Sequence, residues 1–227
     1  MSFRDLNDMF TRITSSATRN RNKTFYLACE GDRTEVDYFK EIQTHRRALG
    51  IKSTISIECL PIIDGRNNPL ALAELLIRKK DSLSDSIDDE FYLVCDRDKD
   101  SFTQFSEVVD LCTAHNINFS ITTPCFEFWL LLHFTNCNDI SKSDLLENRP
   151  VSLAHTFISN LISEKIKALN PRAKGYAKDT LESTFKFFQG NIKNAINHSQ
   201  LFSNDIIELE STLGTRVHLL LQSLLSQ

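Results

Sequence analysis

Three aspartates follow the most strand-like segment of the chain at intervals of two residues. The segment EFYLVCDRDKDSF places Asp96, Asp98 and Asp100 directly after a run of apolar and β-favouring residues. Between Asp81 and Glu107 there are nine acidic and two basic residues. Neighbouring carboxylates repel one another unless solvent or a cation relieves the repulsion. Mg²⁺ takes such oxygen ligands together with water and phosphate oxygens, so the spacing indicates either a solvated turn or a metal site.

A further carboxylate, Glu30, ends another strand-like segment, TFYLACEG. Gly31 follows it and has no side chain, so a backbone or a phosphate could approach closely there. Thr34 and Glu35 then begin a predicted helix, where Thr34 could cap the first turn and Glu35 could complement the helix dipole or support the metal site. The predicted metal ligands are Glu30, Asp96, Asp98 and Asp100. The corresponding cofactor is Mg²⁺ or Mn²⁺.

Two more candidates lie in CFEFWLLLHF, residues 125 to 134, which is apolar on all sides and predicts a buried helix or a buried turn into one. A buried carboxylate such as Glu127 needs a partner, a proton or a metal. His133 could be either a core residue whose ring nitrogens are hydrogen-bonded within the protein or a catalytic group. We predict Glu30, Glu127 and His133 as the catalytic candidates, with the structural interpretation of the last two left open.

Positive charge gathers further along the chain, where residues 165 to 193 contain seven basic and two acidic residues. A helical face of lysines is usually only solvated, but an acidic cleft would repel a polyanion unless nearby positive charge compensated. An aromatic ring within RAKGYAK could also stack on a base. The predicted nucleic-acid contacts are Arg172, Lys174, Tyr176 and Lys178.

The elements that must position these residues alternate between strand and helix from residue 24 to about residue 123. Strand-like runs occur in TFYLACEG, TISIECL, FYLVC and INFSITT, and helical patterns separate them. This alternation predicts an α/β fold with a mainly parallel sheet of four or slightly more strands, flanked by helices. Ligands gather at the carboxyl ends of the strands in such sheets, and both acidic sites follow strand ends.

Beyond about residue 150 every periodic segment is predicted to be helical, including an apolar stripe from Leu181 to Ile196 that only Gly190 interrupts. The expected organisation is a flexible lead-in (1–21), an α/β domain (22–145) and a helical C-terminal subdomain (146–227).

Composition narrows the class of protein. The net charge of −4 and the pI near 5.9 exclude a globally basic nucleic-acid coat protein, although a local basic groove remains compatible with them. The six cysteines form no CxxC pair and no zinc-type spacing, which favours reduced, structural thiols. No apolar run reaches signal-peptide or membrane-span length, so we expect a soluble cytoplasmic protein.

The pairing of Glu30 with Asp96 and Asp98 resembles a Toprim domain, in which a Glu on the first strand and a DxD on a later strand hold Mg²⁺. The segments CEGDRTEVDYF and TTPCFEFWLLLHF resemble the two signature segments of the RloB family, and NNPLALAE, VCDRDKD and the Tyr176–Lys178 pair also fit. Thr122 and Thr123 replace the Ser-Asn pair of that pattern. The resemblance implies a Toprim-type nuclease of bacterial antiphage loci, acting with an AAA- or ABC-type (RloA-like) ATPase.

Together these features predict Mg²⁺-dependent phosphodiester hydrolysis of DNA or RNA, tRNA included. Asp96 and Asp98 would hold the metal, Glu30 would ligate it or move a proton, and Asp100 and Glu127 would hold a second ion or orient the first. Two alternatives stay open: a non-catalytic docking subunit of an ATPase complex, and a metal-dependent phosphatase or nucleotidyl transferase. Self-association is also open. The sequence has no Walker-type Gly-Lys loop, so any ATP use would belong to a partner.

Overall fold

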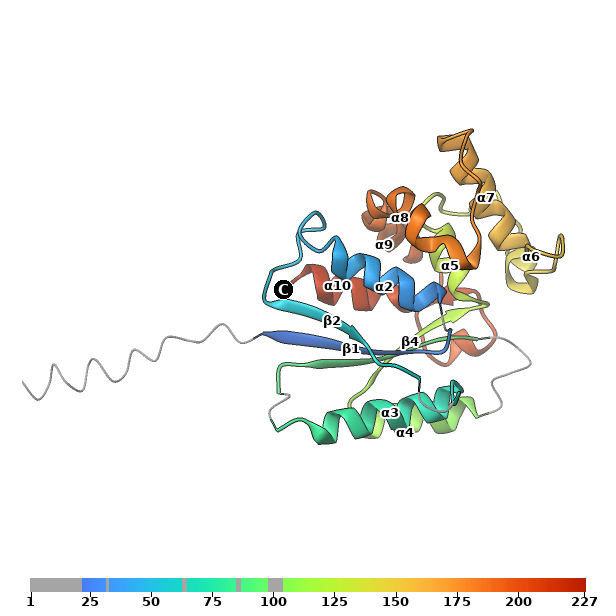
Figure 1. The fold of residues 1–227 in the computed structure, drawn as a ribbon. Helices are drawn as coiled ribbons and strands as arrows, with labels where there is room; N and C mark the ends of the chain where they lie inside the picture. Colours follow the sequence, from blue (N-terminus) through green and yellow to red (C-terminus); the bar gives the residue numbers. More distant parts are fainter. Residues whose placement is uncertain (1–21, 32, 63–64, 85–86, 98–103) are drawn as a thin grey trace, which may run out of the picture.

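A single sheet with helices on both faces organises the molecule (Figure 1). The computed structural model describes residues 22–31, 33–62, 65–84, 87–97 and 104–227. The strands are β1 (Lys23–Cys29), β2 (Ile55–Cys59), β3 (Glu90–Asp96), β4 (Asn118–Thr123) and β5 (Gly214–Thr215), arranged in the order β2-β1-β3-β4-β5. The first four are parallel, and β5 pairs antiparallel with β4. The predicted α/β class with a mainly parallel sheet is therefore confirmed.

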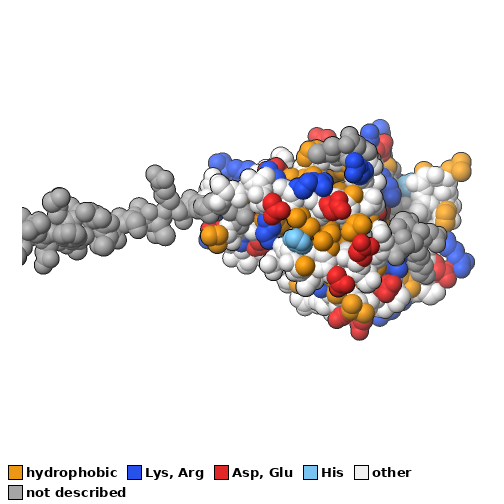
Figure 2. Space-filling view, turned by 90° about the horizontal axis from the view of Figure 1, so that it is seen from below, with side chains coloured by type: hydrophobic (Ala, Val, Ile, Leu, Met, Phe, Trp, Pro, Cys, Tyr) orange, Lys and Arg blue, Asp and Glu red, His pale blue; other side chains and the backbone are white. Residues whose placement is uncertain are grey.

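The helices divide between the two faces of this sheet. Their bounds are α2 Thr34–Thr44, α3 Pro69–Ser82, α4 Phe105–Ala114, α5 Phe126–Leu131, α6 Lys142–Glu147, α7 Phe157–Leu169, α8 Leu181–Gln189, α9 Ile192–Ser199 and α10 Val217–Leu225, with 3₁₀ turns η1 Lys178–Thr180 and η2 Glu208–Glu210. Helices α3 and α4 cover one face, and α2 and α10 lie against the other, with α5 to α9 beyond them (Figure 1). On the described part of the α3/α4 side, acidic and basic side chains are interspersed (Figure 2).

The strands are buried on both faces because each one supplies two separate cores. In β1, Phe25 and Leu27 pack into the core under α2, α5 and the C-terminal helices, whereas Tyr26 and Ala28 pack into the core under α3 and α4. This explains why the strand segments read as continuous apolar runs: helices cover both faces of a parallel sheet, so neither set of alternating side chains reaches water.

The start of α3 follows from the local sequence. Asn68 occupies the N-cap position and its side chain accepts a hydrogen bond from the Ala71 N–H at 3.0 Å, with Pro69 in the first helical turn. Helix α2 differs from expectation at its start. Thr34 is its first residue, and Arg33 occupies the N-cap position without a side-chain cap bond. Thr34 therefore does not cap the helix.

The C-terminal part of the chain shares the core of the α/β layer. Buried residues of α8, α9 and α10 belong to the same cluster as residues of β1 and α2, and β5 extends the sheet itself. The boundary predicted at residue 145 is thus not a boundary of the hydrophobic core. The expectation of helices alone beyond residue 150 was wrong at β5, and the stripe from Leu181 to Ile196 is divided between α8 and α9.

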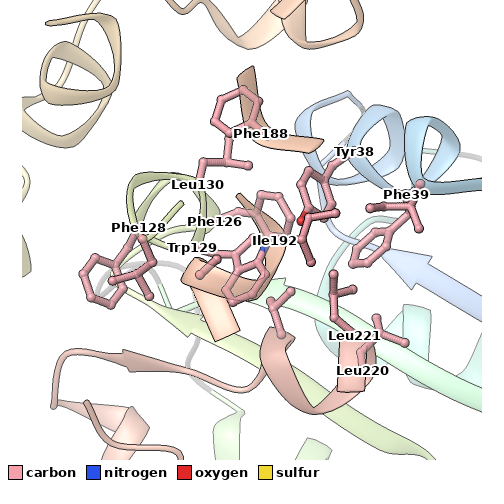
Figure 3. Close-up of a cluster of buried hydrophobic side chains, with 14 of the residues drawn as sticks. Tyr38, Phe39, Phe126, Phe128, Trp129, Leu130, Phe188, Ile192, Leu220 and Leu221 are labelled. Atoms are coloured by element: carbon pink, nitrogen blue, oxygen red, sulfur yellow. The ribbon is translucent and has the colours of Figure 1, made fainter. Parts of the chain in front are cut away.

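Helix α5 lies at the centre of this shared core. All six of its residues are buried. Phe126 packs against Tyr38 and Phe39 of α2, whereas Phe128 points the other way (Figure 3) and packs edge-on against Phe202. The segment that predicted a buried helix or a buried turn into one forms a buried helix.

His133 follows α5 and lies inside the same aromatic core. Its Nε2 is 3.1 Å from the Tyr38 hydroxyl and its Nδ1 is 3.1 Å from the Trp129 carbonyl oxygen. The ring packs edge-on against Trp129 and Phe188, and only 1% of the residue is exposed. Both ring nitrogens are therefore engaged with protein groups. Burial lowers the pKa of His133 to about 3, so the imidazole is neutral at physiological pH.

This burial predicts acid sensitivity. The folded-state pKa lies below the unfolded value of about 6.5, so the stability that neutral His133 contributes is present at neutral pH and is lost as the pH falls from about 6.5 towards 3. Between pH 7.5 and 5 the free energy of unfolding should fall by about 2 kcal/mol from this group alone. This fall in the free energy of unfolding is measured by urea denaturation of the wild type and of His133→Gln at both pH values. An equal pH dependence in the two proteins would contradict the buried neutral imidazole.

Candidate functional site

The carboxyl ends of β1 and β3 bring two predicted metal ligands together. Glu30 directly follows β1, and its backbone N–H donates to the Val94 carbonyl at 3.0 Å, which continues the pairing of the two strands. The Glu30 Oε2 atom then accepts a hydrogen bond from the backbone N–H of Asp96 at 3.2 Å. The Glu30 side chain is therefore turned towards the end of β3, as expected from two strands that are neighbours in a parallel sheet.

Asp96 also connects the sheet to α5. Its Oδ1 accepts a hydrogen bond of 2.7 Å from the N–H of Phe126, the first residue of that helix. The bond holds the carboxylate in one orientation and satisfies a helix N–H that has no intrahelical partner. Asp96 thus has a structural contact as well as a place at the strand end.

Glu35 reaches the same region from the first turn of α2, where it is 4% exposed. A Cβ atom added to Gly31 would overlap with the Glu35 carboxylate, so the missing side chain at Gly31 makes room for a neighbouring acid within the protein. Burial, with a smaller effect of the nearby Glu127 carboxylate, raises the pKa of Glu35 to about 7. The sequence assigned Gly31 to close approach by a ligand; here it accommodates Glu35.

Glu127 lies on α5 with only 2% of its surface exposed, and two groups from the C-terminal region hold it. The Lys178 ammonium is 3.0 Å from Glu127 Oε1, and the Tyr176 hydroxyl donates to the same oxygen at 3.3 Å. Partial burial disfavours the charge on Lys178, but the Glu127 carboxylate outweighs this effect and raises the pKa of the lysine. The partner that a buried carboxylate requires is therefore a cation from the chain itself.

Glu30, Glu35, Asp96 and Glu127 form what we call the carboxylate cluster. Burial raises the pKa of Asp96 well above its usual value, and the charges of the other three members raise it further. The Phe126 N–H acts in the opposite direction but does not reverse the shift. The raised pKa values of Asp96 and Glu35 mean that these two acids tend to take up protons at neutral pH unless positive charge binds beside them.

The donor chemistry of this cluster fits a hard divalent cation, which takes carboxylate oxygens as ligands. In the part of the chain that the structure describes, however, no three His, Cys, Asp or Glu side chains are arranged to hold a metal ion together. Two of the four predicted ligands, Asp98 and Asp100, lie outside the described residues. Of the predicted set, Glu30 and Asp96 are brought together, and the metal itself remains a prediction.

The remaining predicted residues are spread over different surroundings. His133 lies in the aromatic core described above and does not join the carboxylate cluster. Tyr176 is 2% exposed, so its ring is not available to stack on a base; burial raises its pKa, and its hydroxyl is near both Glu127 and Thr34. Arg172 and Lys174 are exposed, and Lys178 is exposed while its ammonium reaches Glu127.

A cavity of about 500 Å³ opens beside the cluster. Asp96, Cys125 and Glu127 line it from the sheet and α5, Lys178 lines it from η1, and Asn148, Arg149 and Thr156 come from the segment between α6 and α7. Asn148, Arg149 and Thr156 lie in a part of the chain that carries no motif or charge run. Only the position of this segment in space connects it with the site.

A family model, described as RloB-like protein, matches residues 25–224 and thus most of the chain. The chain belongs to the RloB-like family. A search of curated proteins and a search of solved structures found no match. Among the described residues, no helix is long and apolar enough to cross a membrane.

In this RloB-like chain the two signature-like segments meet at the carboxylate cluster. CEGDRTEVDYF supplies Glu30 from the end of β1 and Glu35 from α2, and PCFEFW supplies Glu127 from α5. The hydrogen bond from Phe126 to Asp96 joins the second segment to VCD at the end of β3. Segments separated by about a hundred residues thus deliver acids to one edge of the sheet.

The close approach of Gly31 and Glu35 can be tested by a double-mutant cycle. Gly31→Ala should lower the free energy of unfolding by about 1–3 kcal/mol, because the added methyl group must displace a buried carboxylate. In a Glu35→Ala background the same substitution should cost less than about 0.5 kcal/mol. Urea denaturation of the four proteins gives the coupling energy. Equal costs in both backgrounds would show that Gly31 does not make room for Glu35.

Proposed function

We propose that this RloB-like protein is a Mg²⁺-dependent nuclease of the Toprim type. One observation carries the proposal: the carboxylates that follow β1 and β3 adjoin at one sheet edge, joined by the bond from Asp96 N–H to Glu30, with Glu35 and Glu127 near enough to raise the pKa of Asp96. The acids lie at the carboxyl ends of the strands, which is where an α/β sheet binds ligands. A divalent cation bound there would relieve the repulsion between the carboxylates.

In this proposal Glu30 and Asp96 hold the metal, with Asp98 and Asp100 as further candidates outside the described residues. The ion, when bound, would polarise a phosphoryl oxygen and lower the pKa of a bound water. The Phe126 N–H holds the orientation of the Asp96 carboxylate, and Lys178 and Tyr176 hold that of Glu127. The exposed Lys178 side chain would also supply positive charge to a phosphate that approaches the acids.

The proposed setting is an antiphage defence locus with an AAA- or ABC-type ATPase as partner. Membership of the RloB-like family and the lack of a Gly-Lys phosphate loop in the sequence support this part of the proposal. The carboxylate cluster supports the proposed chemistry and is not an argument for the defence locus or the ATPase partner. Nuclease assays should therefore be run both with and without an RloA-like ATPase.

The catalytic part of the proposal predicts which substitutions abolish cleavage. Glu30→Gln and Asp96→Asn should each lower the rate of Mg²⁺-dependent cleavage at least ~100-fold, because each removes a proposed metal ligand. Glu182→Gln changes an exposed glutamate of α8 and should leave the rate unchanged. Single-turnover cleavage of labelled DNA and RNA, with circular dichroism to check folding, measures the effect. Undiminished cleavage by folded Glu30→Gln or Asp96→Asn would reject the site.

Metal binding itself has a readout that does not depend on activity. A millimolar site should stabilise the folded protein by about 1 kcal/mol at 10 mM Mg²⁺ and raise the Tm by about 2–4 °C. Glu30→Gln should abolish the shift, while Glu182→Gln should retain it. The comparison is made by differential scanning fluorimetry at constant ionic strength. If both variants keep the wild-type shift, Mg²⁺ binds elsewhere.

A further inference from the structure

The size of the cavity beside the carboxylate cluster limits what kind of nucleic acid can enter that cavity. Asp96 and Glu127 belong to both the cluster and the cavity lining, so a group bound in the cavity lies next to the acids. Its volume of about 500 Å³ falls within the range of about 300–1,000 Å³ typical of sites that hold small organic ligands. Among the described residues, this cavity gives Asp96 and Glu127 an approach of nucleotide size.

A base-paired helix does not fit such a space. A sphere of this volume is about 10 Å across. A DNA duplex is wider than this, because its two backbones are already about 12 Å apart across the major groove. A single unpaired nucleotide is the largest unit of a nucleic acid that could enter. Enzymes that act inside such pockets use single strands or turn one nucleotide out of the duplex, at a cost of a few kcal/mol for unpairing and unstacking.

The far wall of the cavity is held in place before any ligand binds. Asn148 Nδ2 donates to Cys125 Sγ at 3.2 Å, and Asn148 Oδ1 accepts from the Ile158 N–H at 3.0 Å. Asn148 has a φ of 42°, in the left-handed region that Asn tolerates better than most residues. These contacts connect the end of α6 to α5 and α7, so the cavity is part of the packed structure.

Asp96 and Glu127 line the cavity next to the sheet, whereas two cations and one further acid, Glu147, line it towards solvent. Arg149 is 78% exposed and Lys178 is 67% exposed at the side chain, and both line the cavity. Arg149 is also held 2.6 Å from Glu147. Cations in this position suit the phosphates on either side of an inserted nucleotide, while Pro124 and Leu146 offer apolar surface to its base.

We propose that the cavity receives one unpaired nucleotide and that the substrate class of this protein is single-stranded nucleic acid, including loops and strand ends, rather than intact duplex. This inference rests on the proposed nuclease function for the identity of the ligand. In this inference Arg149 is a positioning residue, because its exposed guanidinium would contact the phosphate next to the inserted nucleotide.

Binding can be measured separately from cleavage. Fluorescence anisotropy in Ca²⁺, with the substrate checked for integrity on a gel, compares a labelled 15-nucleotide single strand with the same strand annealed to its complement. We expect the single strand to bind at least about tenfold more tightly. Arg149→Glu should weaken its binding at least about tenfold. Lys52→Glu makes the same charge change at an exposed position before β2, outside the cavity lining, and should weaken binding less than about threefold.

The outcomes separate this inference from the nuclease proposal. Duplex bound as tightly as single strand, or equal weakening by Arg149→Glu and Lys52→Glu, would overturn the inference even if Mg²⁺-dependent cleavage is found. Selective single-strand binding that depends on Arg149, without cleavage under any condition tested, would uphold the cavity assignment and reject the nuclease. Binding of neither form overturns the inference.

Discussion

The repulsion between carboxylates at one sheet edge is the constraint on which the rest of this structure depends. Glu30 and Asp96 follow adjacent parallel strands, so the sheet itself forces them together, and burial adds to the cost of keeping them charged. The chain offsets part of this cost with backbone N–H groups and with Lys178. The pKa values of Asp96 and Glu35 nevertheless stay raised, and the cation of the proposed function would favour the charged form of both acids.

The C-terminal region contributes directly to the charge environment of the carboxylate cluster. Lys178 and Tyr176 come from a segment that starts beyond α7, yet both contact Glu127 on α5. The same region packs against α2 and β1 in one continuous core, which fixes where those two side chains can lie. A shift of the C-terminal helices would therefore change the charge environment of the acids as well as the packing.

The aromatic core explains why two polar residues in one apolar segment have different surroundings. Glu127 and His133 are six residues apart, and both are buried. Glu127 faces the cavity and a lysine, whereas His133 is enclosed by Tyr38, Trp129 and Phe188 and is held neutral. The direction in which each side chain points from this segment decides between a site residue and a core residue, and residue type alone does not.

The sequence by itself determined the α/β class, the four parallel strands, the cap of α3 and the positions of Glu30 and Asp96 at strand ends. Each of these follows from local pattern: apolar runs, turn and cap residues, and the rule that neighbouring parallel strands end at one edge. Tertiary structure alone decided the place of β5, the burial of Tyr176 and His133, the use of Gly31 by Glu35, and the cavity wall from Asn148 to Thr156. These depend on contacts between residues far apart in the chain, and no local pattern encodes which distant segment packs against which.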